Sequence, residues 1–154
     1  MPASARLLLP LTLGALLCGS MLEARPRDVS VATPPPSRTT MDSVYTNAQA
    51  TDGADVFAAY CRNCHTPTVH AGPPFKNKWY GRTLGELFGY LRREMPKSDP
   101  GSMSDEDYAL SLAYLLKING MPAGAEPLAA DSAALHGIRL DSVRSTPPTQ
   151  SVRR

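Results

Sequence analysis

Five consecutive residues, Cys61-Arg62-Asn63-Cys64-His65, combine two thiols and an imidazole at a spacing that can hold a porphyrin. Two cysteines separated by two residues and followed directly by a histidine are typical of covalent haem attachment: each thiol forms a thioether with a vinyl group, and the histidine ligates the iron. The two thioethers hold the ring against the chain, and His65 can then place its imidazole beneath the metal. The motif predicts one haem c, bound covalently through Cys61 and Cys64.

A zinc site and a thioredoxin-like dithiol pair are the alternative interpretations of the same residues. A zinc site needs two further ligands at comparable spacing, but the remaining cysteine, Cys18, and the remaining histidines, His70 and His136, form no second cluster. A dithiol motif belongs in a β-α-β context, whereas the residues around Cys61 have a helical pattern. The sequence therefore favours haem attachment over both alternatives.

Residues 1–24 have the pattern of a secretory signal peptide. The apolar run over residues 7–17 follows a basic residue, is too short to span a bilayer, and is followed by small residues. Cleavage after Ser20 or Ala24 fits this pattern, and a lipoprotein signal ending before Cys18 is the alternative. We expect the mature protein in the periplasm or on the extracytoplasmic face of the membrane, held there only by lipid at that cysteine or by a membrane complex.

Composition divides the rest of the chain into four segments. Residues 25–50 are rich in Pro, Ser, Thr and Ala, which predicts a disordered linker. Residues 51–120 carry helical patterns and are expected to form the folded domain. Residues 121–141 predict an arm that lies on this domain and contains a short helix over residues 131–136. Residues 142–154 predict a disordered tail.

The first predicted helix begins at Thr51 or Asp52, either of which can cap it, and leads directly into Cys61. Gly53 is unfavourable inside a helix, so its presence predicts a place where another helix crosses closely. The prolines and glycines of residues 66–81 then predict an extended loop without helix.

Two further helices follow this loop. Thr83 opens one of them with a capping box to Glu86, and Pro96 ends it. The last begins at Ser104 with an acidic first turn and ends at Gly120, which supplies a left-handed stop. The expected buried face of the former consists of Leu84, Leu87, Phe88, Leu91 and Met95. The expected buried face of the latter consists of Leu110, Ala113, Tyr114 and Ile118.

The order of these elements over residues 51–120 resembles the class I cytochromes c. A helix that ends in the haem motif is followed by a proline-rich loop, a helix that ends in Met95-Pro96, and a final amphipathic helix. The runs over residues 81–88 and 119–124 also look like the small cytochrome c domains associated with quinoprotein dehydrogenases. The resemblance implies an all-α fold with three main helices around one haem, here with long irregular N- and C-terminal extensions.

The resemblance also implies how the first and last helices meet. In this family a glycine and an aromatic residue of the first helix pack against an aromatic residue of the last. Gly53, Phe57 and Tyr114 match these positions. Ser111 stands where the family usually has leucine, which makes the crossing less apolar.

Further site residues follow from the same resemblance. His65 would be the proximal ligand, with its second ring nitrogen donating to the carbonyl of a proline in a Gly-Pro step. Gly72-Pro73 matches this step, which makes Pro73 a better candidate than Pro74. Trp79 is a candidate to donate a hydrogen bond to a haem propionate, and an ordinary core residue is the alternative. Tyr80 and Arg82 are weaker candidates for the same propionates.

The opposite axial position of the iron has five candidate ligands. These are Met95, Met103, Met121, His70 and His136. We assign Met95, because it ends a helix whose apolar face must meet the haem and because a loop of family-like length follows it. A core methionine beside a five-coordinate iron is the alternative.

The resemblance implies an electron-transfer protein and not an enzyme. A five-coordinate haem sensor or enzyme, and a haem-stabilised structural subunit of a larger redox complex, are the alternatives. Residues 61–97 contain seven basic and two acidic side chains, a net charge of +5, which suits a redox partner with an acidic docking surface; a solvated basic face is the alternative. Nucleic acid is not an expected partner, since no stacking platform accompanies the basic residues.

Overall fold

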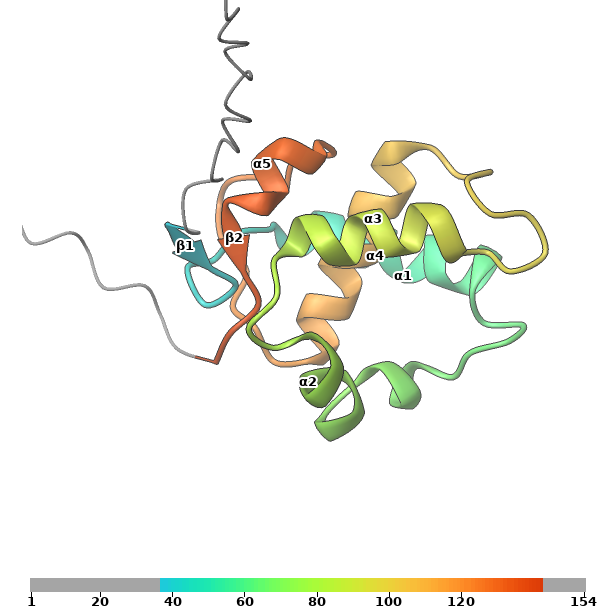
Figure 1. Cartoon of the computed structure of the whole chain (residues 1–154), viewed down its shortest axis with the longest axis horizontal. Helices are drawn as coiled ribbons and strands as arrows, with labels where there is room; N and C mark the ends of the chain where they lie inside the picture. Colours follow the sequence, from blue (N-terminus) through green and yellow to red (C-terminus); the bar gives the residue numbers. More distant parts are fainter. Residues whose placement is uncertain (1–36, 143–154) are drawn as a thin grey trace, which may run out of the picture. The chain divides into compact units, whose positions relative to one another are not determined.

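The computed structural model of the protein describes residues 37–142 (Figure 1). The elements are β1 (Arg38–Thr39), α1 (Asn47–Tyr60), the 3-10 helix η1 (Pro67–His70), α2 (Pro73–Trp79), α3 (Leu84–Glu94), α4 (Asp105–Ile118), α5 (Ser132–His136) and β2 (Ile138–Arg139). This mainly helical composition confirms the all-α prediction. The predicted signal peptide, residues 25–36 of the predicted linker and residues 143–154 of the predicted tail lie outside the described residues. Within residues 37–142, no helix is long and apolar enough to span a bilayer.

Helix α1 begins one turn earlier than the sequence predicts. Its N-cap is Thr46, whose hydroxyl accepts from the backbone N–H of Gln49, while the Gln49 side chain accepts from the backbone N–H of Thr46. Thr51 lies inside the helix, where its hydroxyl donates to the carbonyl of Asn47 at 3.0 Å. The prediction of a start at Thr51 or Asp52 is therefore wrong, because a complete capping box is available further upstream.

The close crossing predicted at Gly53 is confirmed. A Cβ atom built on this glycine would overlap the carbonyl oxygen of Leu110 in α4 and lie 2.6 Å from the carbonyl carbon of the same residue. Phe57 packs against Tyr114 of α4, with 5.2 Å between the ring centroids. The backbone of α1 thus meets the backbone of α4 at a point where no side chain fits between them.

Helix α4 is buried on more sides than predicted. Ala113 is buried as expected, but Leu110, Tyr114 and Ile118 are only partly buried. The other buried positions are Tyr108, Ala109, Ser111, Leu112, Leu115 and Leu116. Because α4 contacts both α1 and α3, two neighbours cover it, and the prediction of a single buried stripe is wrong.

The predicted ends of α3 and α4 are confirmed. Thr83 and Glu86 form the expected capping box at the start of α3, and the backbone N–H of Thr83 lowers the pKa of the Glu86 carboxyl by hydrogen bonding. Ser104 caps α4, with three acidic residues in the first turn. Gly120 follows the end of α4 with a φ of 78°, the left-handed conformation that was predicted.

The segment predicted as an extended loop contains two short helices, η1 and α2. Pro73 and Pro74 are the first two residues of α2, where a proline nitrogen needs no helical hydrogen-bond partner. Gly72 precedes them with a φ of 63°, a conformation that favours glycine. The prolines therefore start a helix here, and the prediction that they exclude helix is wrong.

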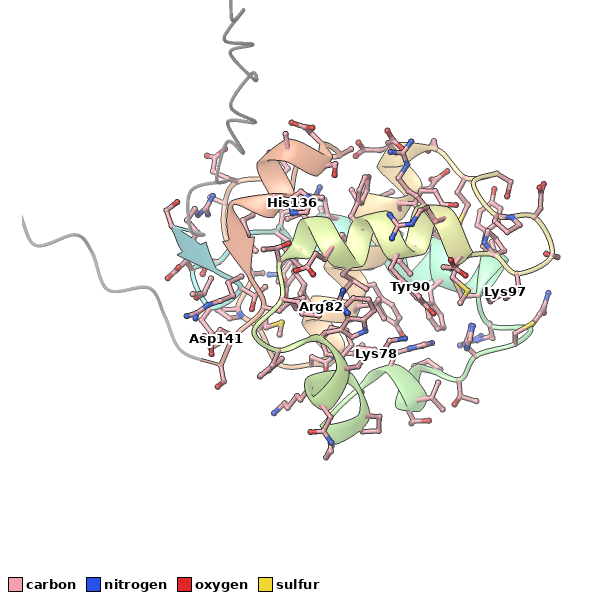
Figure 2. All side chains as sticks on the ribbon, viewed as in Figure 1. Lys78, Arg82, Tyr90, Lys97, His136 and Asp141 are labelled. Atoms are coloured by element: carbon pink, nitrogen blue, oxygen red, sulfur yellow. The ribbon has the colours of Figure 1, made fainter. Side chains whose placement is uncertain are left out.

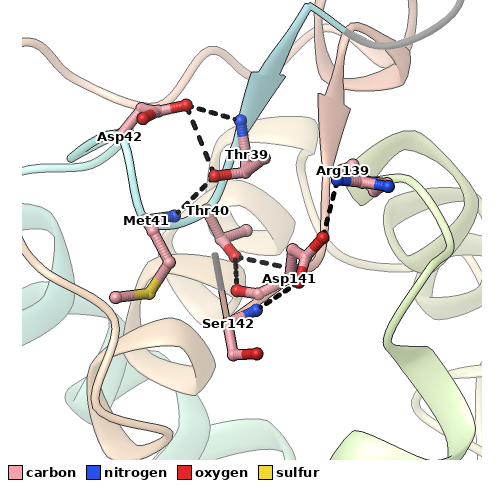
Figure 3. A network of polar contacts seen from close by, with 7 residues as sticks. All are labelled: Thr39, Thr40, Met41, Asp42, Arg139, Asp141 and Ser142. Carbon is pink, nitrogen blue, oxygen red and sulfur yellow. Dashed lines mark hydrogen bonds and ion pairs between the residues drawn. The ribbon is translucent and has the colours of Figure 1, made fainter. Parts of the chain in front are cut away.

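The two ends of the described chain are joined to each other (Figures 1 and 3). Strands β1 and β2 pair in parallel, and the Thr40 hydroxyl donates to the carbonyl of Asp141 at 3.1 Å and accepts from the backbone N–H of that residue. Tyr45 donates through its hydroxyl to the carbonyl of Met121 at 2.7 Å. Residues 38–46 are thus part of the folded domain, and the predicted linker boundary at residue 50 lies too far along the chain.

The predicted arm over residues 121–141 packs on the helices and contains the expected short helix, α5. Gln49 of α1 holds the arm through two hydrogen bonds with the backbone of Leu128, at 2.9 and 2.7 Å. His136 of α5 contacts the start of α3, where its Nδ1 lies 3.0 Å from the Thr83 hydroxyl. The arm therefore fixes the N-terminal ends of both α1 and α3.

We predict that Gly53→Ala destabilises the full-length protein by about 1–3 kcal/mol, because the added methyl group collides with the backbone of α4. Gly89→Ala in α3 is the matched control: its Cβ would meet only the flexible guanidinium of Arg93, at 3.0 Å. Higher helix propensity should leave this control neutral or more stable by up to about 1 kcal/mol. Urea unfolding measures both changes, and equal stabilities of the two variants would contradict the crossing.

Candidate functional site

The haem motif lies on the wall of a cavity of about 400 Å³. We call it the motif cavity. Its walls come from the end of α1, the motif itself, η1, α2, the second half of α3 with the residues that follow it, and one face of α4. Phe57, Phe75, Trp79, Leu87 and Leu115 are buried residues of this wall. A cavity with apolar walls and few polar groups is the usual form of a cofactor site.

The three motif residues reach the cavity because the chain turns tightly where α1 ends. The backbone N–H groups of Cys64 and His65 both donate to the carbonyl of Cys61, at 3.1 and 2.9 Å. Cys61 is partly buried, and Cys64 is exposed. Burial raises the pKa of the Cys61 thiol. The structure thus brings all three predicted motif residues to one cavity wall.

Of the five candidates for the opposite axial position, Met95 and His70 line the motif cavity. Met95 is the C-cap residue of α3, and its carbonyl accepts from the hydroxyl of Tyr108 at 2.7 Å, which fixes this end of the helix to α4. Met103 and Met121 are buried in the core away from the cavity wall, at 7% and 3% exposure.

His70 lies beside His65, with 4.7 Å between the ring centroids, and contacts Phe57 edge-on. Burial lowers the pKa of His70, and the nearby charges of His65 and Lys78 lower it further. His70 therefore lies on the part of the cavity wall that carries the motif histidine.

The structure places Pro74, and not Pro73, on the cavity wall. Pro73 is one residue earlier, at the first position of α2. Trp79 ends α2 and is 5% exposed. It lines the cavity and contacts Tyr90 of α3, with 5.3 Å between the ring centroids. The roles predicted for Pro73 and Trp79 toward a haem stay predictions.

Among the described residues, two lysines line the cavity, and no aspartate or glutamate does. The Lys78 ammonium lies 4.3 Å from the ring centroid of Tyr90 and 5.1 Å from that of Trp79 (Figure 2). Lys97 lies on the other side of Tyr90 in the same view and pairs with Glu94 at 2.9 Å. Arg82, by contrast, packs on Trp79 outside the cavity wall. Cations beside an apolar cavity suit a flat apolar ligand with anionic substituents.

Asn119, which the sequence did not identify as a site residue, holds the loop that follows the motif. Its side chain accepts from the backbone N–H of Gly72 at 3.0 Å and donates to the carbonyls of His70 and Leu115, both at 2.8 Å. One amide thus ties η1 and the start of α2 to the end of α4. An asparagine directly before the helix-ending glycine was the available signal, since such residues often bond to backbone groups.

Ser111 also lines the cavity, from α4, and it is 4% exposed. Among the buried side-chain nitrogen and oxygen atoms in the described part of the chain, its Oγ is the one without a hydrogen-bond partner. Ser111 stands where the related family usually has leucine, and it therefore places a buried hydroxyl against the motif cavity.

The sequence matches the protein family described as cytochrome C oxidase, cbb3-type, subunit III, over residues 48–115. This region runs from the first turn of α1 to the last turn of α4 and contains the motif. The domain is a class I, monohaem c-type cytochrome domain. The family match confirms the predicted fold class. The general function of such a domain is that of a haem c electron carrier. No curated protein and no solved structure matches the chain.

Haem c, the cofactor that this domain implies, fits the residues present. Two thiols and an imidazole are together on one wall, a thioether lies elsewhere on the wall, and two lysines accompany apolar and aromatic side chains. Nowhere in residues 37–142 do three or more His, Cys, Asp or Glu side chains gather as a metal site.

Proposed function

We propose that the protein carries single electrons between redox proteins outside the cytoplasm, through a haem c held by Cys61, Cys64, His65 and Met95. The observation that carries this proposal is the convergence of the motif and Met95 on one cavity. Haem c, when bound, gains and loses one electron at its iron. The export signal predicted in residues 1–24 supports the location, since thioether formation is completed after export.

Different residues of the chain would hold different parts of the haem. Cys61 and Cys64 would fasten it to the end of α1, and His65 would ligate the iron. Met95 would supply a thioether as a second iron ligand, a weak donor that favours the ferrous state and excludes external ligands. Lys78 and Lys97 would supply positive charge for the propionates. Apolar side chains of the wall, such as Phe75 and Leu87, keep water from the ring face.

The experiment that tests this function is reversible one-electron titration of the mature, full-length protein. We expect the mass of the polypeptide to increase by one haem, the haem to resist acid extraction, and a single one-electron wave in voltammetry. Cys64→Ser should lose one thioether while keeping the other. A colourless mature protein without added mass, obtained from a host that completes haem attachment, would refute the proposal.

Met95→Ala tests the axial ligand and separates the electron carrier from the five-coordinate sensor or enzyme. We expect the haem to stay attached, the reduction potential to fall by at least about 60 mV, which is tenfold for one electron, and the ferrous protein to bind carbon monoxide quickly. The near-infrared band from sulfur to ferric iron should disappear. Met103→Ala is the matched control, because Met103 is a buried methionine away from the cavity wall, and it should keep that band. Loss of the band in the control alone would show that the ligand is Met103.

We also propose that the mouth of the motif cavity meets the acidic surface of a redox partner. Support comes from its two lysines, from the absence of acidic wall residues, and from the exposed Tyr60 and Val69, which are 47% and 51% exposed and also line the cavity. Apolar contact surrounded by basic charge suits a partner with carboxylates around its own redox centre.

Lys97→Gln should slow oxidation of the ferrous protein by hexacyanoferrate(III), a trianion, several-fold at low ionic strength, and salt should weaken the difference. Lys117→Gln is the matched control, since it changes the net charge equally but lies on α4 outside the cavity wall. Stopped-flow kinetics measures both rates. Equal slowing by the two variants would show that net charge, and not the cavity mouth, attracts the anion.

A further inference from the structure

The buried hydroxyl of Ser111 is the unexplained polar group of the motif cavity. A buried polar atom without a partner costs about 1–3 kcal/mol, so each instance calls for a reason. Ser111 lies in the middle of α4, one turn before Leu115, and both residues line the cavity. No group in the described part of the protein forms a hydrogen bond with this Oγ atom. The hydroxyl can therefore interact only with what occupies the cavity.

The buried part of the cavity wall to which this hydroxyl belongs is largely apolar. The other buried residues of the cavity wall carry hydrocarbon side chains, apart from the indole N–H of Trp79. The remaining hydroxyl and amide groups of the wall belong to Tyr60, Asn63, Ser98 and Tyr90, of which the first three are exposed to solvent and Tyr90 is partly buried. In such a low-dielectric environment one dipole acts more strongly on a nearby charge than a solvated group does.

We propose that Ser111 sets the reduction potential of the haem, by turning its hydroxyl oxygen toward the ring in the ferric state. This inference rests on the proposed function. The ferric centre carries one positive charge more than the ferrous centre. A hydroxyl without a fixed partner can rotate about its Cβ–Oγ bond to stabilise the added charge. Ser111 therefore stabilises the ferric form selectively and lowers the potential, whereas the leucine expected at this position leaves that form unsupported.

A pair of matched variants isolates the hydroxyl from the shape of the side chain. Ser111→Thr keeps a hydroxyl, and Ser111→Val has nearly the same shape without one. We expect S111V to have a higher potential than S111T by a two- to fourfold change in the one-electron equilibrium constant, about 20–35 mV at 59 mV per tenfold. Ser111→Ala should likewise raise the potential above that of the natural protein. Ser98→Ala, which removes an exposed hydroxyl of the same wall, should shift the potential by less than S111A does.

Voltammetry of the full-length, haem-loaded proteins measures these potentials, and the near-infrared sulfur-to-iron band reports whether the axial ligation is unchanged. With the haem attached and the band intact, equal potentials for S111T and S111V would overturn the role of Ser111 and leave the proposed electron carrier standing. A protein that matures without haem would instead overturn the proposed function itself. A higher potential in S111V and S111A, with unchanged ligation, supports the inference.

Discussion

The structure depends on the close crossing of α1 and α4 at Gly53. Because no side chain separates the two backbones there, Phe57 can pack against Tyr114 and the end of α1 is held at a fixed place on α4. The motif begins directly after that end, so the crossing determines where Cys61 and His65 stand. Asn119, at the other end of α4, fixes the loop that continues from the motif. One helix therefore positions both the attachment residues and the segment that follows them.

The remaining walls of the motif cavity come from α2 and α3. Residues that lie outside the cavity hold α3 in place. Tyr108 holds the backbone of Met95 through a hydrogen bond from α4. The arm over residues 121–141 contacts the start of α3 through His136, and it is itself joined to residues 38–46. The segments before α1 and after α4 also add Val44, Tyr45 and Leu135 to the same buried apolar cluster that the helices form.

Local signals predicted much of this fold correctly. The motif, the capping boxes and the helix-ending Gly120 act through neighbours a few residues away, so the sequence carries all the information that they need. Where two local solutions compete, prediction failed. Thr46 and Thr51 can both cap a helix, and the one with Gln49 three residues later did so. Pro73 and Pro74 can end a helix or begin one, and here they begin α2.

The sequence by itself determined the chemistry of this protein. Two thiols and an imidazole have the spacing that attaches a single haem at the end of a helix, and the helical pattern of the chain predicts the all-α domain that holds it. Only the tertiary structure decided which of five candidate ligands line the cavity, which lysines stand beside it, and that the Ser111 hydroxyl is buried against it. The physical reason is that covalent and capping chemistry depend on residues adjacent in the chain. Burial and the make-up of a cavity wall depend instead on which distant segments pack together.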